Sequence, residues 1–69
     1  MSYLLVSLAS CRREKYLSQE ELAEKADISR VTVAKLERLR RRARGNTVRK
    51  LAQALGVKED SLLRDSAES

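Results

Sequence analysis

The complete absence of proline is the feature that most restricts how this chain of 69 residues can fold. No helix is interrupted from within by a proline ring, and apolar residues recur at spacings of three and four, the period of a helix with one buried face. No stretch alternates apolar and polar residues for long enough to predict a strand. The pattern therefore predicts an all-α chain, and its length suits one small domain, residues 1–69.

Five helical segments are expected from the apolar spacing and from the residues between the apolar stretches. The predicted helices cover about 3–15, 19–26 and 30–38, then a fourth helix capped by Asn46 or Thr47 and ended by Gly56, then about 59–63. Residues 65–69 are expected to fray. The apolar faces predict a core that includes Leu22, Val33, Leu36, Leu51 and Leu55, with Leu4, Leu8 and Cys11 on the first helix.

Short polar residues mark where the helices begin and end. Ser18 and Glu21 have the spacing of a capping box, in which each side chain bonds the backbone N–H of the other residue. Asp27 tolerates the left-handed conformation that a tight turn needs, and Ser29 is expected to cap the third helix. No glycine or proline follows Arg38 until Gly45, which favours an extension of the third helix into residues 39–43.

The positive charge is concentrated in one part of the chain. The net charge is +5, but residues 30–50 hold nine of the 15 basic residues and only one of the 10 acids, Glu37. On the third helix, the 3.6-residue period places Arg30, Val31 and Lys35 on one face and the apolar Val33 and Leu36 on the other. One strongly positive region is typical of a protein that binds a polyanion.

Composition excludes most catalytic chemistry. The chain has no histidine, one cysteine and two glycines, so it lacks a Ser-His-Asp or Cys-His arrangement, a zinc site and a glycine-rich phosphate loop. We therefore expect no enzyme activity, no metal and no cofactor.

The start of the chain superficially resembles a short secretion signal that ends in Leu8-Ala9-Ser10-Cys11. No lysine or arginine precedes its apolar stretch, and cleavage there would remove most of a helix that the core needs. No apolar stretch approaches the length of a membrane span. We expect a cytoplasmic protein without membrane contact, in which Cys11 is a reduced core residue.

Two neighbouring stretches of the chain resemble the Xre-type, phage-repressor-like helix-turn-helix family. The first reads LSQEELAEKADISRVTVAKLER from Leu17 to Arg38, and the second reads TVRKLAQALGV from Thr47 to Val57, followed by Leu62 and Leu63. The resemblance covers about residues 4–63. Tyr16, Asp27 and Leu39 depart from it, because the family usually has glycine at these positions.

The resemblance implies a compact five-helix, lambda-repressor-like domain with its helix-turn-helix at about residues 19–38. It also implies a sequence-specific, double-stranded DNA-binding transcriptional regulator that reads the major groove with helix 30–38, as a homodimer on a palindromic operator. Phage repressors, antitoxins and restriction–modification controllers all fit, and a partner protein such as a toxin or co-regulator is compatible with them.

Site residues carried over from the resemblance fall into three groups. The base contacts are Arg30, Val31, Thr32 and Lys35, and a salt bridge joins Arg12 to Glu37. The phosphate contacts are Ser18, Gln19, Arg38, Arg40, Arg41, Arg42 and Arg44, with a neighbouring minor groove as another place for Arg44.

Two other functions are compatible with the same sequence. One is a protein-interaction module of this fold, with an antitoxin or adaptor role, and the other is a non-specific nucleic-acid binder that relies on the arginines alone. The acid-free outer face of the third helix argues against the first, and the presence of only two aromatic residues, Tyr3 and Tyr16, argues against single-strand stacking.

Overall fold

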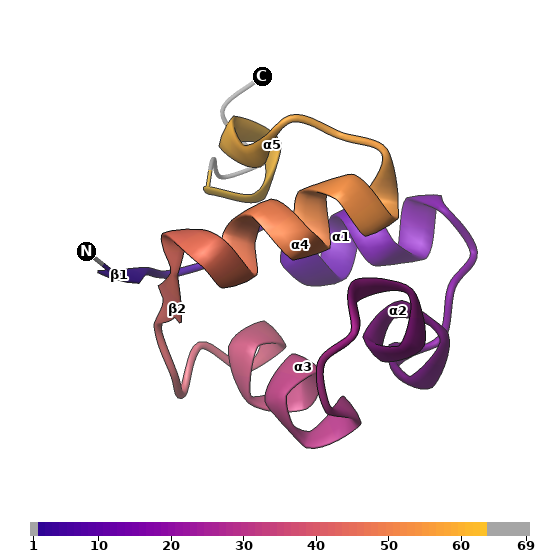
Figure 1. The fold of residues 1–69 in the computed structure, drawn as a ribbon, viewed down its shortest axis with the longest axis horizontal. Helices are drawn as coiled ribbons and strands as arrows, with labels where there is room; N and C mark the ends of the chain where they lie inside the picture. Colours follow the sequence, from indigo (N-terminus) through magenta and orange to yellow (C-terminus); the bar gives the residue numbers. More distant parts are fainter. Residues whose placement is uncertain (1, 64–69) are drawn as a thin grey trace.

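The computed structural model describes residues 2–63, which form five helices and a short two-stranded antiparallel ladder (Figure 1). The helices are α1 (Leu8–Glu14), α2 (Gln19–Ala26), α3 (Arg30–Glu37), α4 (Gly45–Leu55) and α5 (Glu59–Leu63), and the strands are β1 (Ser2–Tyr3) and β2 (Ala43–Arg44). Helix α4 crosses the middle of the molecule, with α5 on one side and α2 and α3 on the other (Figure 1). All five predicted helices are present, and no helix within residues 2–63 has the length and apolar character to cross a membrane.

A single apolar cluster holds the helices together. The five residues predicted for the core are all buried, and so is Leu8; the side chains with almost no exposure are Leu5, Leu8, Leu22, Val33, Leu36, Val48, Leu51 and Leu62. Leu4 is only partly buried, and Leu5 beside it occupies the core instead. Burying a leucine of this kind stabilises the fold by about 1.5–3 kcal/mol, so these side chains supply the main stabilising contribution in a small chain.

The first helix is shorter than predicted, and the expectation of no strand is wrong. Helix α1 begins at Leu8 rather than near residue 3, because β1 pairs with β2 in the register Ser2↔Arg44 and Tyr3↔Ala43. The segment between β1 and α1 turns at Ser7, whose N–H donates to the carbonyl oxygen of Leu62 at 3.1 Å. Tertiary pairing thus overrides the helical spacing of the first residues.

Two predicted helix boundaries in the basic region are also wrong. Helix α3 ends at Glu37 and does not extend into residues 39–43, since Leu39 adopts a left-handed conformation with φ 58°. Helix α4 begins at Gly45, so neither Asn46 nor Thr47 is its cap, and the residue at the N-cap position, Arg44, makes no side-chain capping bond. The chain has to turn after Glu37 to bring Ala43, which is 3% exposed, into the core.

Helices α1, α2, α3 and α4 end in the same backbone motif. In each, the first or second residue after the helix is left-handed, and the N–H of the residue after it bonds a carbonyl oxygen in the last turn, as in a Schellman motif. The left-handed residues are Tyr16, Asp27, Leu39 and Gly56. The closing bonds run from Leu17 to Arg12, Ile28 to Ala23, Arg40 to Lys35 and Val57 to Ala52, at 3.0–3.2 Å. The prediction of a left-handed Asp27 is confirmed. The predicted fraying of residues 65–69 lies outside the described residues.

Candidate nucleic-acid interface

Two short helices joined at an angle present the candidate interface. Ser18 opens α2 with the predicted capping box: its hydroxyl accepts from the N–H of Glu21 at 3.0 Å, and its own N–H donates to Glu21 Oε1 at 2.8 Å. The bond from the Ser18 N–H lowers the pKa of the Glu21 carboxyl most strongly, and the nearby Ser18 hydroxyl lowers it further. Ser29 opens α3, and its hydroxyl accepts from the N–H of Thr32 at 3.0 Å. Both helix starts are therefore set by local side-chain bonds, as the sequence predicts.

The outer face of α3 carries three of the four residues predicted to contact bases. Arg30, Val31 and Lys35 are exposed, whereas Val33 and Leu36 on the opposite face are buried. Val31 is 61% exposed, which leaves its side chain available for an apolar contact. The fourth residue, Thr32, differs: it is partly buried, and its hydroxyl shares a 2.8 Å hydrogen bond with that of Ser29.

The basic segment, residues 38–44, joins α3 to α4 next to this face. All of its arginines are exposed, and within residues 2–63 none of them forms an ion pair with an acid; they are Arg38, Arg40, Arg41, Arg42 and Arg44. Five unneutralised guanidinium groups on seven residues repel one another unless anions lie between them. This segment therefore favours a polyanionic partner.

Two small depressions flank α3 and combine cationic groups with other hydrogen-bond donors. One, of about 100 Å³, lies between α3 and the basic segment and is lined by Thr32, Leu36, Arg41, Arg42, Ala43, Arg44 and Thr47. The other, shallower and of about 390 Å³, lies at the start of α2 and is lined by Arg12, Ser18, Gln19, Glu20 and Arg30. The positive end of the α2 dipole also favours an anion in the second depression, although Glu20 at its edge opposes one.

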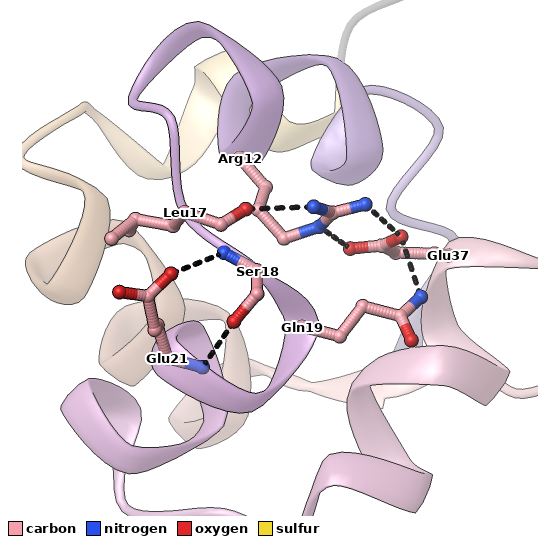
Figure 2. A network of polar contacts seen from close by, with 6 residues as sticks. All are labelled: Arg12, Leu17, Ser18, Gln19, Glu21 and Glu37. Atoms are coloured by element: carbon pink, nitrogen blue, oxygen red, sulfur yellow. Dashed lines mark hydrogen bonds and ion pairs between the residues drawn. The ribbon is translucent and has the colours of Figure 1, made fainter.

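Arg12 and Glu37, predicted as a salt bridge, lie together (Figure 2), and Arg12 lines the depression at the start of α2. Arg12 Nε donates to Glu37 Oε2 at 2.6 Å and Nη2 donates to Oε1 at 3.1 Å, while Nη1 donates to the carbonyl oxygen of Leu17 at 2.7 Å. The bond to Glu37 raises the pKa of Arg12 above its ordinary value. Only 6% of the Glu37 side chain is exposed, so the one acid of the basic region does not oppose an anion on the surface.

Gln19 belongs to the same network, which the sequence does not predict. Its Nε2 donates to Glu37 Oε1 at 3.0 Å, so the first residue of α2 is tied to the last residue of α3 (Figure 2). One N–H of this amide group is thereby used within the protein. The carboxylate of Glu37 thus orients two residues, Arg12 and Gln19, that line the depression at the start of α2.

The start of α4 is a feature of the site that sequence reasoning missed. Helix α4 has no acid in its first turn, and the side chain at its N-cap position does not compete with an anion for the first backbone N–H groups. Thr47 in this turn lines the smaller depression together with Arg41 and Arg44. The sequence Gly45-Asn46-Thr47 does indicate the start of a helix. It does not distinguish a start with a side-chain cap from one without. Within residues 2–63, no group of three or more potential metal ligands is found.

The fold and this surface define a helix-turn-helix domain of the lambda-repressor-like class. The helix-turn-helix family model matches residues 8–62. An uncharacterized HTH-type transcriptional regulator of Sinorhizobium fredii, y4dJ, is 40% identical over 63 residues, which cover 91% of this chain and 82% of that protein. The chain belongs to the helix-turn-helix family of transcriptional regulators, which is not an enzyme family.

Solved structures of similar proteins support the same fold. The restriction-modification controller protein C.AhdI from Aeromonas hydrophila is 36% identical, with a TM-score of 0.78 over 80% of this chain and 83% of the other. The hypothetical transcription factor NHTF from Neisseria is also 36% identical, with a TM-score of 0.83 over 94% of this chain and 79% of the other. These similarities confirm the resemblance and the five-helix class predicted from the sequence.

Proposed function

We propose that this protein is a sequence-specific regulator that binds double-stranded DNA and reads the major groove with α3. The observation that carries the proposal is the contrast between the two faces of this helix. Its inner face is fixed in the core by Val33 and Leu36, and its outer face is exposed, basic and free of acids. A helix held in this way presents its outer side chains rigidly to a groove that admits one helix.

The proposed base contacts are Arg30, Val31 and Lys35. The guanidinium group of Arg30 suits two hydrogen bonds to a guanine, Lys35 suits a guanine acceptor, and Val31 suits the methyl group of a thymine. Thr32 contributes less in this proposal, because its hydroxyl is already bonded to Ser29.

The proposed phosphate contacts lie on both sides of α3. Ser18 and Gln19 at the start of α2 form one group, and the other consists of the arginines of the basic segment with the uncapped start of α4. Such contacts fix the register of the protein on the duplex and carry no sequence information themselves.

We further propose that the protein binds as a homodimer. The eight residues of α3 can contact only a few base pairs, and a regulator of this class gains a longer site when two copies bind half-sites about one helical turn, roughly 34 Å, apart. The expected operator is therefore an inverted repeat.

The first test selects bound sites from a random duplex library at about 0.15 M salt, where purely phosphate-driven binding is weakened. An enriched inverted repeat supports the proposal. A pool that binds at low salt without an enriched motif supports a non-specific nucleic-acid binder instead, and no binding at any salt concentration supports the protein-interaction module.

Three single substitutions then separate the two kinds of contact. Arg30→Ala and Lys35→Ala should each cost about 1–3 kcal/mol at particular base pairs and relax the preference there, whereas Arg41→Ala should weaken specific and random duplexes about equally. Lys58→Ala is the matched control, because Lys58 is an exposed cation that directly precedes α5. Helix α5 lies on the other side of α4 from α3 (Figure 1). Equal losses on both duplexes for the first three variants would overturn the assignment of α3 as the reading helix.

A further inference from the structure

The two ends of the basic segment are held in different ways. At its start, α3 ends in a Schellman motif whose last residue is Arg40. In the other three helices that end in this motif, the corresponding residues are Leu17, Ile28 and Val57, and all three pack against the core. An apolar contact from this position usually stabilises the motif. Arg40 is exposed and makes no such contact, so the α3 end of the basic segment is the less strongly anchored of the two.

Strand β1 supplies the anchor at the other end. The antiparallel pairing of Tyr3 with Ala43 and of Ser2 with Arg44 joins the last residues of the basic segment to the start of the chain. The ring of Tyr3 packs against the core cluster and lies over Gly45, where an added Cβ would be 4.0 Å from its Cε2 atom. Paired residues point to the same side of an antiparallel ladder, so Tyr3 and Ala43 face the core while Ser2 and Arg44 face the solvent.

We propose that β1 is a positioning element for DNA binding: it holds the basic segment so that Arg41, Arg42 and Arg44 face the phosphate backbone. This inference rests on the proposed function. The three arginines line one depression with Thr47, and their repulsion would spread an unanchored segment. No proline stiffens residues 38–44, so their shape depends on the two anchors, of which β1 is the stronger. Tyr3 is the positioning residue, and it acts through Ala43 and Gly45 without touching DNA.

The test compares Tyr3→Ala with Val57→Ala. Both substitutions remove a partly buried side chain from the edge of the core, but Val57 follows the far end of α4 from β2. Affinities for the selected operator and for a random duplex are measured from about 50 to 200 mM salt, at a temperature where circular dichroism shows both variants folded.

Tyr3→Ala is expected to bind both duplexes about tenfold more weakly, the effect of losing roughly one charge-assisted hydrogen bond. Its plot of log affinity against log salt should also become shallower by about 0.9 for each phosphate contact given up. Val57→Ala should keep the wild-type affinity and slope. If wild type binds DNA and Tyr3→Ala binds it with the same affinity and slope, the role of β1 is overturned while the proposed function stands. If wild type itself binds no duplex DNA, the proposed function fails first.

Substitutions at Ser2 give a second test that does not depend on core packing. Ser2 is exposed, so Ser2→Gly and Ser2→Val weaken and strengthen the ladder without opening a cavity. Ser2→Gly should lower the affinity for both duplexes and Ser2→Val should raise it. Each change should be at most about fivefold, because strand propensities span about 1 kcal/mol. Hydrogen exchange of the backbone amides of β1 and β2 in the free protein should become faster in Ser2→Gly and slower in Ser2→Val. Changes in exchange without any change in affinity would overturn the proposal.

Discussion

Replacing Tyr16 with glycine should stabilise the protein, although the substitution removes a large side chain. Tyr16 is left-handed, with φ 58°, and its side chain is 93% exposed, so almost no packing is lost. A residue with a Cβ atom pays about 1–2 kcal/mol in this conformation, and glycine loses about 0.5–1 kcal/mol more backbone entropy on folding. The difference predicts a gain of about 0.5–1 kcal/mol in the free energy of unfolding. For a domain of this size, that gain raises Tm by about 2–8 °C.

The measurement is urea unfolding followed by circular dichroism, with the midpoint and the slope fitted separately. Tyr16→Ala is the matched control, because it removes the same ring but keeps a Cβ atom in the left-handed position, and it should show no gain. Glu24→Gly tests glycine at an exposed position inside α2 and should lose about 1 kcal/mol. Leu39→Gly should gain less than Tyr16→Gly, since Leu39 is only 44% exposed and some packing is lost. If Tyr16→Gly is no more stable than Tyr16→Ala, the reasoning about backbone strain at this turn is refuted.

Three further predictions concern stability. Glu37→Ala should lower the free energy of unfolding by about 2–4 kcal/mol, since it leaves the guanidinium of Arg12 partly buried without its carboxylate; urea unfolding at neutral pH measures this, and a loss below about 0.5 kcal/mol would contradict it. The bonds from Ser18 lower the pKa of Glu21 in the folded state below 4.5, its value in the unfolded chain. The stabilisation that these bonds give is therefore complete at pH values above 4.5, and it is lost as the pH falls through the lower pKa of the folded state. Tm should therefore fall less in Glu21→Gln than in wild type between about pH 5 and pH 3, and parallel curves would contradict this. Leu51→Ala opens a cavity at a fully buried position and should cost about 2–5 kcal/mol in the same urea assay; a cost under about 1 kcal/mol would show that the core closes around it.

The features predicted correctly from the sequence are those determined within a few residues. Ser18 and Ser29 cap their helices through bonds to residues three positions later, and the helical period alone separates the buried Val33 from the exposed Lys35. Asp27 occupies a left-handed position for a reason intrinsic to its short polar side chain. Such local bonds and periods can be read directly from the order of residues.

The features missed are those set by distant parts of the chain. Strand β1 forms because residues 2–3 meet residues 43–44, and neither segment is long enough to show an alternating pattern. The end of α3 at Glu37 has a similar origin, since Leu39 favours helix by itself but is left-handed here, where the chain turns toward the buried Ala43. The same holds for the site: the exposure of Arg30, Val31 and Lys35 follows from the local helical period, whereas the bond between Gln19 and Glu37 depends on how α2 packs against α3.

The ion pair of Arg12 and Glu37 has a consequence for binding as well as for stability. Replacing such a pair with apolar residues often leaves stability unchanged or improves it, so stability alone gives little reason for a charge pair in this position. Glu37, however, is the one acid within residues 30–50, and an outward-facing carboxylate there would oppose phosphate beside Arg38. Arg12 neutralises this carboxylate, and Gln19 donates a hydrogen bond to it. The side chains of Arg12 and Gln19 both line the depression where an anion is proposed to bind. The pair therefore fixes the end of α3 and, in the same geometry, keeps the outer face of α3 free of negative charge.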